Sequence, residues 1–201
     1  MKPEKSKAEK RTKLIVAITG ASGANYAVAL LRALKEKGIE VHLVVSEWAE
    51  ETLKLETGMK TNDLKKIVHR AYANDDLAAP IASSSFLCDG MIVMPCTLKT
   101  ASEIANAHCG TLISRAADNT LKMRGRLVVG VRETPLSTPA LEQLHKISIA
   151  GGIVMPLCPA FYHKPKEIKD LEAFIVGKAL DCLGIGNSEF GRWGEGSRKE
   201  K

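Results

Sequence analysis

Short apolar runs alternate with longer amphipathic segments along most of the chain, and this alternation limits the fold more than any other feature. The apolar runs, rich in Val, Ile and Leu, predict buried strands over residues 14–19, 41–46, 91–94, 127–131 and 152–155. The segments between them predict helices over residues 24–37, 47–56, 99–107, 112–123, 138–150 and 168–183. Strands separated by helices form a parallel sheet covered on both faces, so we expect a three-layer α/β domain.

The formal charge of +6 lies in the two ends of the chain. The first 13 residues carry +4 and the last 11 carry +2, so residues 14–190 are neutral. A nucleic-acid binder carries its basic patch on the folded body, so we expect no nucleic-acid partner. We expect a disordered basic tail over residues 1–12, one domain over 13–190 and a C-terminal tail over 191–201. Within the domain, Pro80 and three consecutive serines predict an irregular loop over 72–86.

The cysteines indicate a reducing compartment. All five are dispersed, without a C-x-x-C pair, which is typical of a cytoplasmic protein. The Lys-rich start has no apolar stretch of the kind found in secretory leaders, and no apolar run approaches membrane-spanning length, so we expect no membrane partner. His108 and Cys109 form the only close pair of a histidine and a cysteine, and adjacent helical residues rarely chelate one ion. We therefore expect no metal site.

The first strand runs into the turn Gly20-Ala21-Ser22-Gly23, which opens a helix. Small residues there let backbone N–H groups and the helix N-terminus approach an anion. The turn departs from G-x-G-x-x-G, with Ser22 third and Asn25 sixth, and the second strand ends in Ser46 where an adenosine-binding acid is expected. These residues favour a mononucleotide phosphate over NAD. The alternative is a turn that only tightens a strand–helix junction.

Two further strand ends carry polar groups. Thr97-Leu98-Lys99-Thr100 follows the third strand and suits a phosphate or a ring edge, or is an ordinary capped helix start. Arg132 and Glu133 directly follow the run 127–131. Ligands of open α/β sheets bind outside the carboxyl ends of the strands, so an acid and a base there indicate a site, unless both are merely solvated.

Two other segments have both a functional and a structural interpretation. Arg115, Asp118, Asn119 and Lys122 share one helix face, which is either part of a site or a solvated face with ion pairs. Tyr162, in the Pro-bracketed segment Phe161-Tyr162-His163, either binds phosphate or packs as an aromatic. His163 either acts as a general acid or base or faces solvent.

Together, four segments resemble the UbiX-type flavin prenyltransferases. They are Gly20-Ala21-Ser22-Gly23, Arg115-Ala116-Ala117-Asp118 with Lys122, Val131-Arg132-Glu133-Thr134-Pro135-Leu136 and Pro159-Ala160-Phe161-Tyr162-His163. The similarity runs from about Lys13 to Arg192-Trp193-Gly194-Glu195. It implies a Rossmann-like, flavodoxin-type domain that binds FMN over residues 13–190 and assembles into dodecamers with sites between subunits.

The resemblance also implies an activity. The chain would transfer the dimethylallyl group of dimethylallyl phosphate to N5 and C6 of reduced FMN, closing a fourth ring without a metal. The product, prenylated FMN, would serve a UbiD-type decarboxylase.

Site residues carried over from the family fall into three sets. FMN would bind Gly20, Ala21, Ser22, Ser46, Thr97, Leu98, Lys99, Thr100 and Arg132. The prenyl phosphate would bind Tyr162, Lys178, Arg115 and Lys122. Catalysis would fall to Glu56, Glu133, Ser22 and Lys122. Glu56 would supply a proton to the leaving phosphate, and Glu133 would take the ring proton lost at C6.

The chain departs from the family in places. Many relatives carry Arg where this chain has Lys178, which keeps the charge without bidentate geometry. The loop 72–86 aligns poorly, so it gives no prenyl contacts. Both departures leave the preference for monophosphate or diphosphate open.

Other activities remain as alternatives. They are an FMN-dependent decarboxylase of cysteine-type substrates, an FMN carrier without transferase activity, and an NAD-dependent dehydrogenase. The first requires an active-site His and a different substrate clamp. The last lacks the third glycine and the ribose-binding acid.

Overall fold

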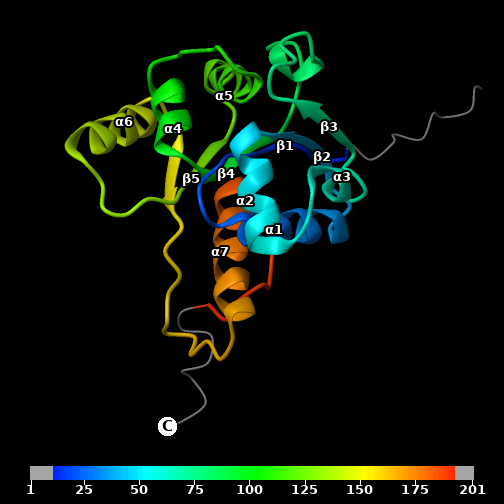
Figure 1. Cartoon of the computed structure of the whole chain (residues 1–201), viewed down its shortest axis with the longest axis vertical. Coiled ribbons are helices and arrows are strands. Elements are labelled where there is room, and N and C mark those ends of the chain that lie inside the picture. Colours follow the sequence, from blue (N-terminus) through cyan, green and yellow to red (C-terminus); the bar gives the residue numbers. More distant parts are fainter. Residues whose placement is uncertain (1–10, 193–201) are drawn as a thin grey trace, which may run out of the picture.

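A computed structural model describes residues 11–192 (Figure 1). Most of the two predicted tails, 1–12 and 191–201, lies outside this range, so the domain boundaries stay predictions. Six parallel strands form one sheet in the order β3-β2-β1-β4-β5-β6. They are β1 (Lys13–Ile18), β2 (Glu40–Val45), β3 (Arg70–Ala73), β4 (Gly90–Cys96), β5 (Leu127–Val131) and β6 (Ile153–Pro156).

Strand β3 corrects the expectation of an irregular loop over 72–86. Tyr72 and Ala73 belong to this strand and pair with Val44 and Val45 of β2. The strand is four residues long and lies at the sheet edge, and its first and last residues are exposed, so it has no apolar run to reveal it. Its presence gives the sheet the six-stranded Rossmann order, while the other five strands keep the flavodoxin order. In both orders the topological switch point lies between β1 and β4.

Helices cover both faces of the sheet (Figure 1). The helices α1 (Ala24–Glu36), α2 (Glu47–Thr57) and α7 (Ile168–Leu183), with the short α3 (Thr61–Leu64), pack on one face. The helices α4 (Leu98–Ala105), α5 (Leu112–Lys122) and α6 (Thr138–Ile149) pack on the other, with the 3-10 turn η1 (Pro80–Ala82). The three-layer α/β prediction is therefore confirmed.

The side chains of the central strand β1 contribute to the hydrophobic core on both faces of the sheet. Leu14, Val16 and Ile18 of β1 point to the α1 and α7 side, and Ile15 and Ala17 point to the α4 and α5 side; all five are almost fully buried. A strand buried on both faces needs this unbroken apolar run. Within residues 11–192, no helix is both long and apolar enough to cross a membrane.

Candidate functional site

Thr19 joins the carboxyl ends of β1 and β4 at the switch point. Its buried hydroxyl donates to the Pro95 carbonyl at 2.8 Å and accepts from the Thr97 N–H at 2.8 Å. The Thr19 N–H donates to the same carbonyl at 3.1 Å. The sequence assigned Thr19 only as a strand end. A hydroxyl closing an otherwise apolar run was the signal that could have identified it.

Thr19→Val should lower the free energy of unfolding, because it breaks the link between the ends of β1 and β4 at the switch point. The change keeps the shape of the side chain but removes the acceptor of the part-buried Thr97 N–H, which costs about 1 kcal/mol. We expect a lower urea midpoint with an unchanged m-value. Thr52→Val is the matched control, because its hydroxyl bonds only to carbonyls of its own helix. Equal losses in the two variants would contradict the role given to Thr19.

The glycine-rich turn and the two next helix starts converge on this point. A Cβ on Gly20 would lie 2.5 Å from the Trp48 Cβ, so only glycine lets α2 begin so close to the turn. Ser46 caps α2 by accepting from the Ala49 N–H at 3.3 Å. Thr97 caps α4 in the same way, accepting from the Thr100 N–H at 3.2 Å. Both predicted FMN contacts are thus helix caps, and capped N-termini still attract anions.

Arg132 brings the end of β5 to the same place. Its Nε donates to the Ser22 carbonyl at 3.2 Å, across 110 residues of sequence. Glu133 is exposed beside it and accepts from the Thr134 N–H at 3.2 Å. The hydrogen bond places Arg132 beside the glycine-rich turn at the switch point, and Glu133 is the next residue along the same strand end.

A cavity of about 450 Å³ opens at this point. Its lining includes Ser22, Tyr26, Glu56, Arg132, Leu157 and Glu172. Burial raises the pKa of the Tyr26 phenol, and the charge of Glu172 raises it further, which keeps Tyr26 a neutral hydrogen-bond donor. The cavity thus combines two carboxylates, a guanidinium and a phenol with an apolar wall.

Glu56 reaches the cavity from the end of α2. Its carboxylate accepts from the Gly23 N–H at 2.9 Å and from the Ala24 N–H at 2.7 Å, at the start of α1. The second oxygen lies 3.2 Å from the same Gly23 nitrogen. We name Ser22, Ser46, Glu56, Thr97, Arg132 and Glu133, with the turn that begins at Gly20, the switch-point group.

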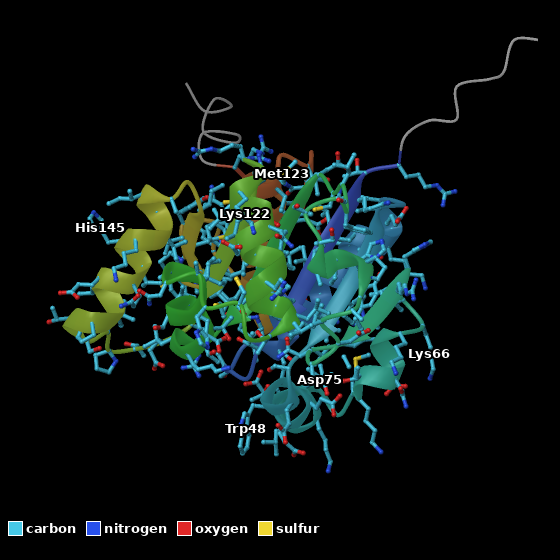
Figure 2. The ribbon with its side chains drawn as sticks, turned by 90° about the horizontal axis from the view of Figure 1, so that it is seen from above. Trp48, Lys66, Asp75, Lys122, Met123 and His145 are labelled. Carbon is cyan, nitrogen blue, oxygen red and sulfur yellow. The ribbon has the colours of Figure 1, made fainter. Side chains whose placement is uncertain are left out.

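The predicted phosphate ligands on α5 lie elsewhere in the chain. Arg115 and Lys122 are both exposed, and Lys122 forms an ion pair with Asp118 at 2.8 Å. Asn119, predicted to share their solvated face, is instead buried and donates to the Ala82 carbonyl at 2.8 Å. Lys122 precedes the start of β5, whereas Arg132 follows its end. Figure 2 shows Lys122 and Trp48 toward opposite sides of the molecule. Arg115 and Lys122 form what we name the α5 group.

Tyr162 and Lys178 belong to a third location, which we name the aromatic group. The Lys178 Nζ lies 5.5 Å from the centre of the Phe190 ring, and Phe190 packs edge-on against Phe174 at 4.9 Å. Tyr162 contacts the same Phe174 at 6.0 Å. His163 stacks on Phe174 and its ring nitrogens are buried, so it does not face solvent.

Helix α7, which carries Lys178, also lines the switch-point cavity, through Leu171 and Glu172. Within one copy of the chain, Lys122 is therefore the predicted ligand that lies at the other end of β5 from Arg132.

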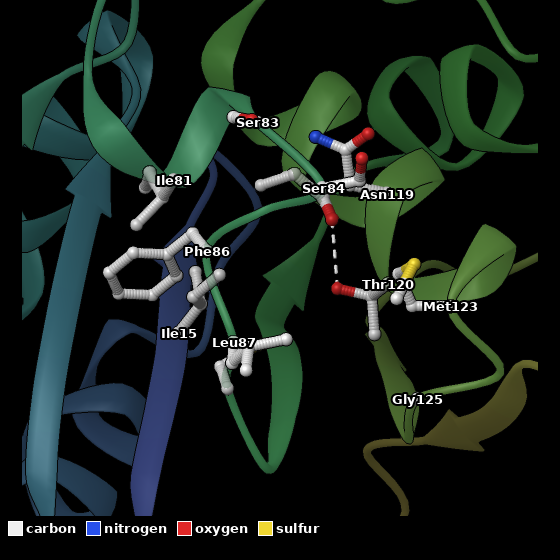
Figure 3. A pocket seen from close by; sticks show the side chains of 12 residues that line it. Ile15, Ile81, Ser83, Ser84, Phe86, Leu87, Asn119, Thr120, Met123 and Gly125 are labelled. Atoms are coloured by element: carbon white, nitrogen blue, oxygen red, sulfur yellow. Dashed lines mark hydrogen bonds between the residues drawn. The ribbon is translucent and has the colours of Figure 1, made fainter.

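A second, smaller cavity lies toward the amino ends of the strands (Figure 3). It measures about 150 Å³ and is lined by Ile15, Ile81, Phe86, Leu87, Thr120 and Met123 among others. Its lining includes Asn119, one of the four polar residues of the candidate α5 face, and Met123, the neighbour of Lys122. No residue of the switch-point group lines it, so that group lies at the other end of the sheet.

Comparison with known proteins identifies the family. The flavoprotein family model matches residues 1–180. The flavin prenyltransferase UbiX of Methanocaldococcus jannaschii is 46% identical over 182 residues, covering 90% of this chain and 98% of that protein.

Two crystal structures are similar across nearly the whole fold. AnUbiX in complex with FMN and dimethylallyl pyrophosphate has a TM-score of 0.90 and 42% identity, over 92% of this chain and 98% of that chain. A dodecameric FMN-dependent UbiX-like decarboxylase from Escherichia coli O157:H7 has a TM-score of 0.86 and 42% identity, over 88% and 97%. The chain therefore belongs to the flavoprotein family and, within it, to the UbiX-type flavin prenyltransferases.

Proposed function

We propose that this protein transfers the dimethylallyl group of dimethylallyl phosphate to N5 and C6 of reduced FMN and so forms prenylated FMN. The observation that carries this proposal is the switch-point cavity. There Ser22, Glu56 and Arg132, which the family resemblance selected, line one space of about 450 Å³. Glu133 follows Arg132 at the same strand end.

The switch-point group fits a flavin mononucleotide. Gly20 lets the backbone of the turn lie close to α2, where the hydroxyl of Ser46 would face the ligand. Thr97 marks the N-terminus of α4, which has no acid in its first turn and where a single phosphate would find N–H groups and a positive helix dipole. Gly20, Ala21, Ser22, the segment Thr97 to Thr100 and Arg132 would hold the rest of the molecule. When bound, reduced FMN supplies the ring atoms that accept the prenyl group.

Residues of the chain would stabilise the phosphate that leaves and would carry the protons that the reaction transfers. Breaking the allylic C–O bond leaves a phosphate, whose charge Arg115, Lys122 and Lys178 would meet with fixed cations, and Tyr162 with a phenolic donor. Attack of N5 on the allylic carbon breaks the C–O bond and releases the N5 proton, and closure at C6 adds a proton to the prenyl double bond while the C6 proton leaves. We assign Glu133 as the base that takes the C6 proton, and Glu56, with Ser22 beside it in the cavity, as the group that hands a proton to the phosphate.

The separation of Lys122 from Arg132 supports a site shared between subunits. Lys122 lies at the other end of β5 from Arg132, and Arg115, Tyr162 and Lys178 are exposed. We propose a homododecamer in which neighbouring copies supply the α5 group and the aromatic group to each switch-point cavity. Exposed apolar side chains offer contact surface for such an assembly, among them Trp48, Leu55, Ile149 and Phe161.

We further propose that the product passes to a UbiD-type decarboxylase in the cytoplasm. The support for the compartment is chemical. Cys88, Cys96, Cys109, Cys158 and Cys182 are all free, which suits a reducing environment.

An anaerobic reaction tests the proposed activity. The purified protein is mixed with chemically reduced FMN and dimethylallyl phosphate, and the released flavin is read by mass spectrometry. We expect a gain of one C5H8 unit that is absent without protein. A parallel reaction with dimethylallyl diphosphate reports which donor is preferred. Bound FMN without a mass gain from either donor would refute the transferase and favour the decarboxylase or carrier alternatives.

A further inference from the structure

Helix α1 receives its N-terminal cap from a distant carboxylate. Gly23 occupies the N-cap position with a φ of 111°, in the left-handed region, and it has no side chain to accept from the first turn. Glu56, 33 residues along the chain, takes that role by accepting from the N–H groups of Gly23 and Ala24. A negative charge that belongs to the protein therefore sits at the positive end of α1.

This position has a known use in sheets of the same strand order. Dinucleotide-binding Rossmann sheets place the ligand pyrophosphate on the N-terminus of the helix that follows the first strand. In this chain Glu56 occupies that place and uses two of the N–H groups that a pyrophosphate would need. Helix α4 differs, because the neutral hydroxyl of Thr97 caps it and its first turn has no acidic residue. Helix α2 is also capped by a neutral hydroxyl, that of Ser46, but it carries Glu47 and Glu50 in its first turn.

We propose that Glu56 is a specificity-determining residue that makes the site accept a flavin with one phosphate and reject dinucleotides such as FAD and NAD. To bind as in other Rossmann sheets, with its pyrophosphate on the N-terminus of α1, a dinucleotide would have to displace the Glu56 carboxylate from the N–H groups of Gly23 and Ala24. A mononucleotide does not need that terminus, because at the proposed site its single phosphate would bind at the start of α4, which has a neutral cap and no acid in its first turn. This inference rests on the FMN site proposed above, and it adds a role for Glu56 that does not depend on proton transfer.

Glu172 supplies a matched control. It lines the same cavity as Glu56 but comes from α7, and its carboxylate is not the one that caps α1. Neutralising Glu172 removes one negative charge from the cavity and leaves the cap in place. Comparison of Glu56→Gln with Glu172→Gln therefore tells whether the preference for FMN over FAD depends on the capped N-terminus of α1 or on the total negative charge of the cavity.

Flavin binding tests the inference without any turnover. Dissociation constants of FMN and FAD are measured by quenching of flavin fluorescence for the full-length wild type, E56Q, E56D and E172Q, with folding checked by circular dichroism. We expect the wild type to prefer FMN by at least about a hundredfold, and E56Q to reduce that preference by at least about tenfold. E56D and E172Q should keep the wild-type preference, since both retain a carboxylate at or near α1.

Several results would overturn the inference. They are equal binding of FMN and FAD by the wild type, an unchanged preference in folded E56Q, or the same loss of preference in E172Q. If E56Q does not fold, FAD binding by E56D decides, since the shorter carboxylate must still exclude it. A wild type that binds neither flavin would refute the proposed function itself, a result distinct from the other three.

Discussion

Glu133→Gln is expected to bind FMN with nearly wild-type affinity and to form the four-ring product about 10²–10⁴ times more slowly. Gln keeps the shape of the side chain and can still accept from the Thr134 N–H, so the end of β5 should stay in place. It cannot take up the ring proton that must leave when the second bond closes. Flavin carrying one C5H8 unit without the fourth ring should therefore accumulate.

Quenched time points resolve this effect. Mass spectrometry reports attachment of the prenyl group, and the absorbance spectrum of the released flavin reports ring closure. Glu142→Gln changes an exposed carboxylate on α6 and should behave as the wild type in both measurements. Normal ring closure by Glu133→Gln would remove Glu133 as the base and assign the proton transfer to another group.

Periodicity predicted most of the fold because burial determines it. Five strands are continuous apolar runs, since helices cover both faces of the sheet, and the long helices show their apolar stripe. Strand β3 escaped prediction because an edge strand with exposed ends needs no such run. The same reasoning found Arg132, since a charged residue directly after a buried run indicates a strand end.

Residues whose role depends on contacts between distant segments could not be predicted in this way. The link from Thr19 to Thr97 spans 78 residues, and the cap that Glu56 places on α1 depends on how α2 crosses the turn. Family resemblance selected Glu56 without revealing the cap. It also combined Lys122 with Arg132 in one site, although they lie at opposite ends of β5 in one chain. A residue set carried over from an oligomeric family does not say which copy supplies each residue.

Co-assembly of two inactive variants should therefore restore activity. Lys122→Met removes a cation that would meet the leaving phosphate and should lower turnover about a hundredfold or more while FMN still binds. Glu133→Gln should be similarly inactive alone. If each site takes Lys122 from one subunit and Glu133 from another, random mixing leaves both wild-type residues in roughly a quarter of the sites.

The measurement is the rate of prenylated FMN formation by mixed oligomers, isolated after co-expression with two different affinity tags. Recovery to roughly a quarter of the wild-type rate is expected for a shared site with random mixing. Co-assembly of Lys122→Met with the double variant Lys122→Met, Glu133→Gln is the control, because no arrangement of those subunits supplies Lys122. If the first mixture stays as inactive as this control, Lys122 and Glu133 serve the same site from one chain. The α5 group would then have to approach the switch-point group by a change in the fold, because this structure keeps them at opposite ends of β5.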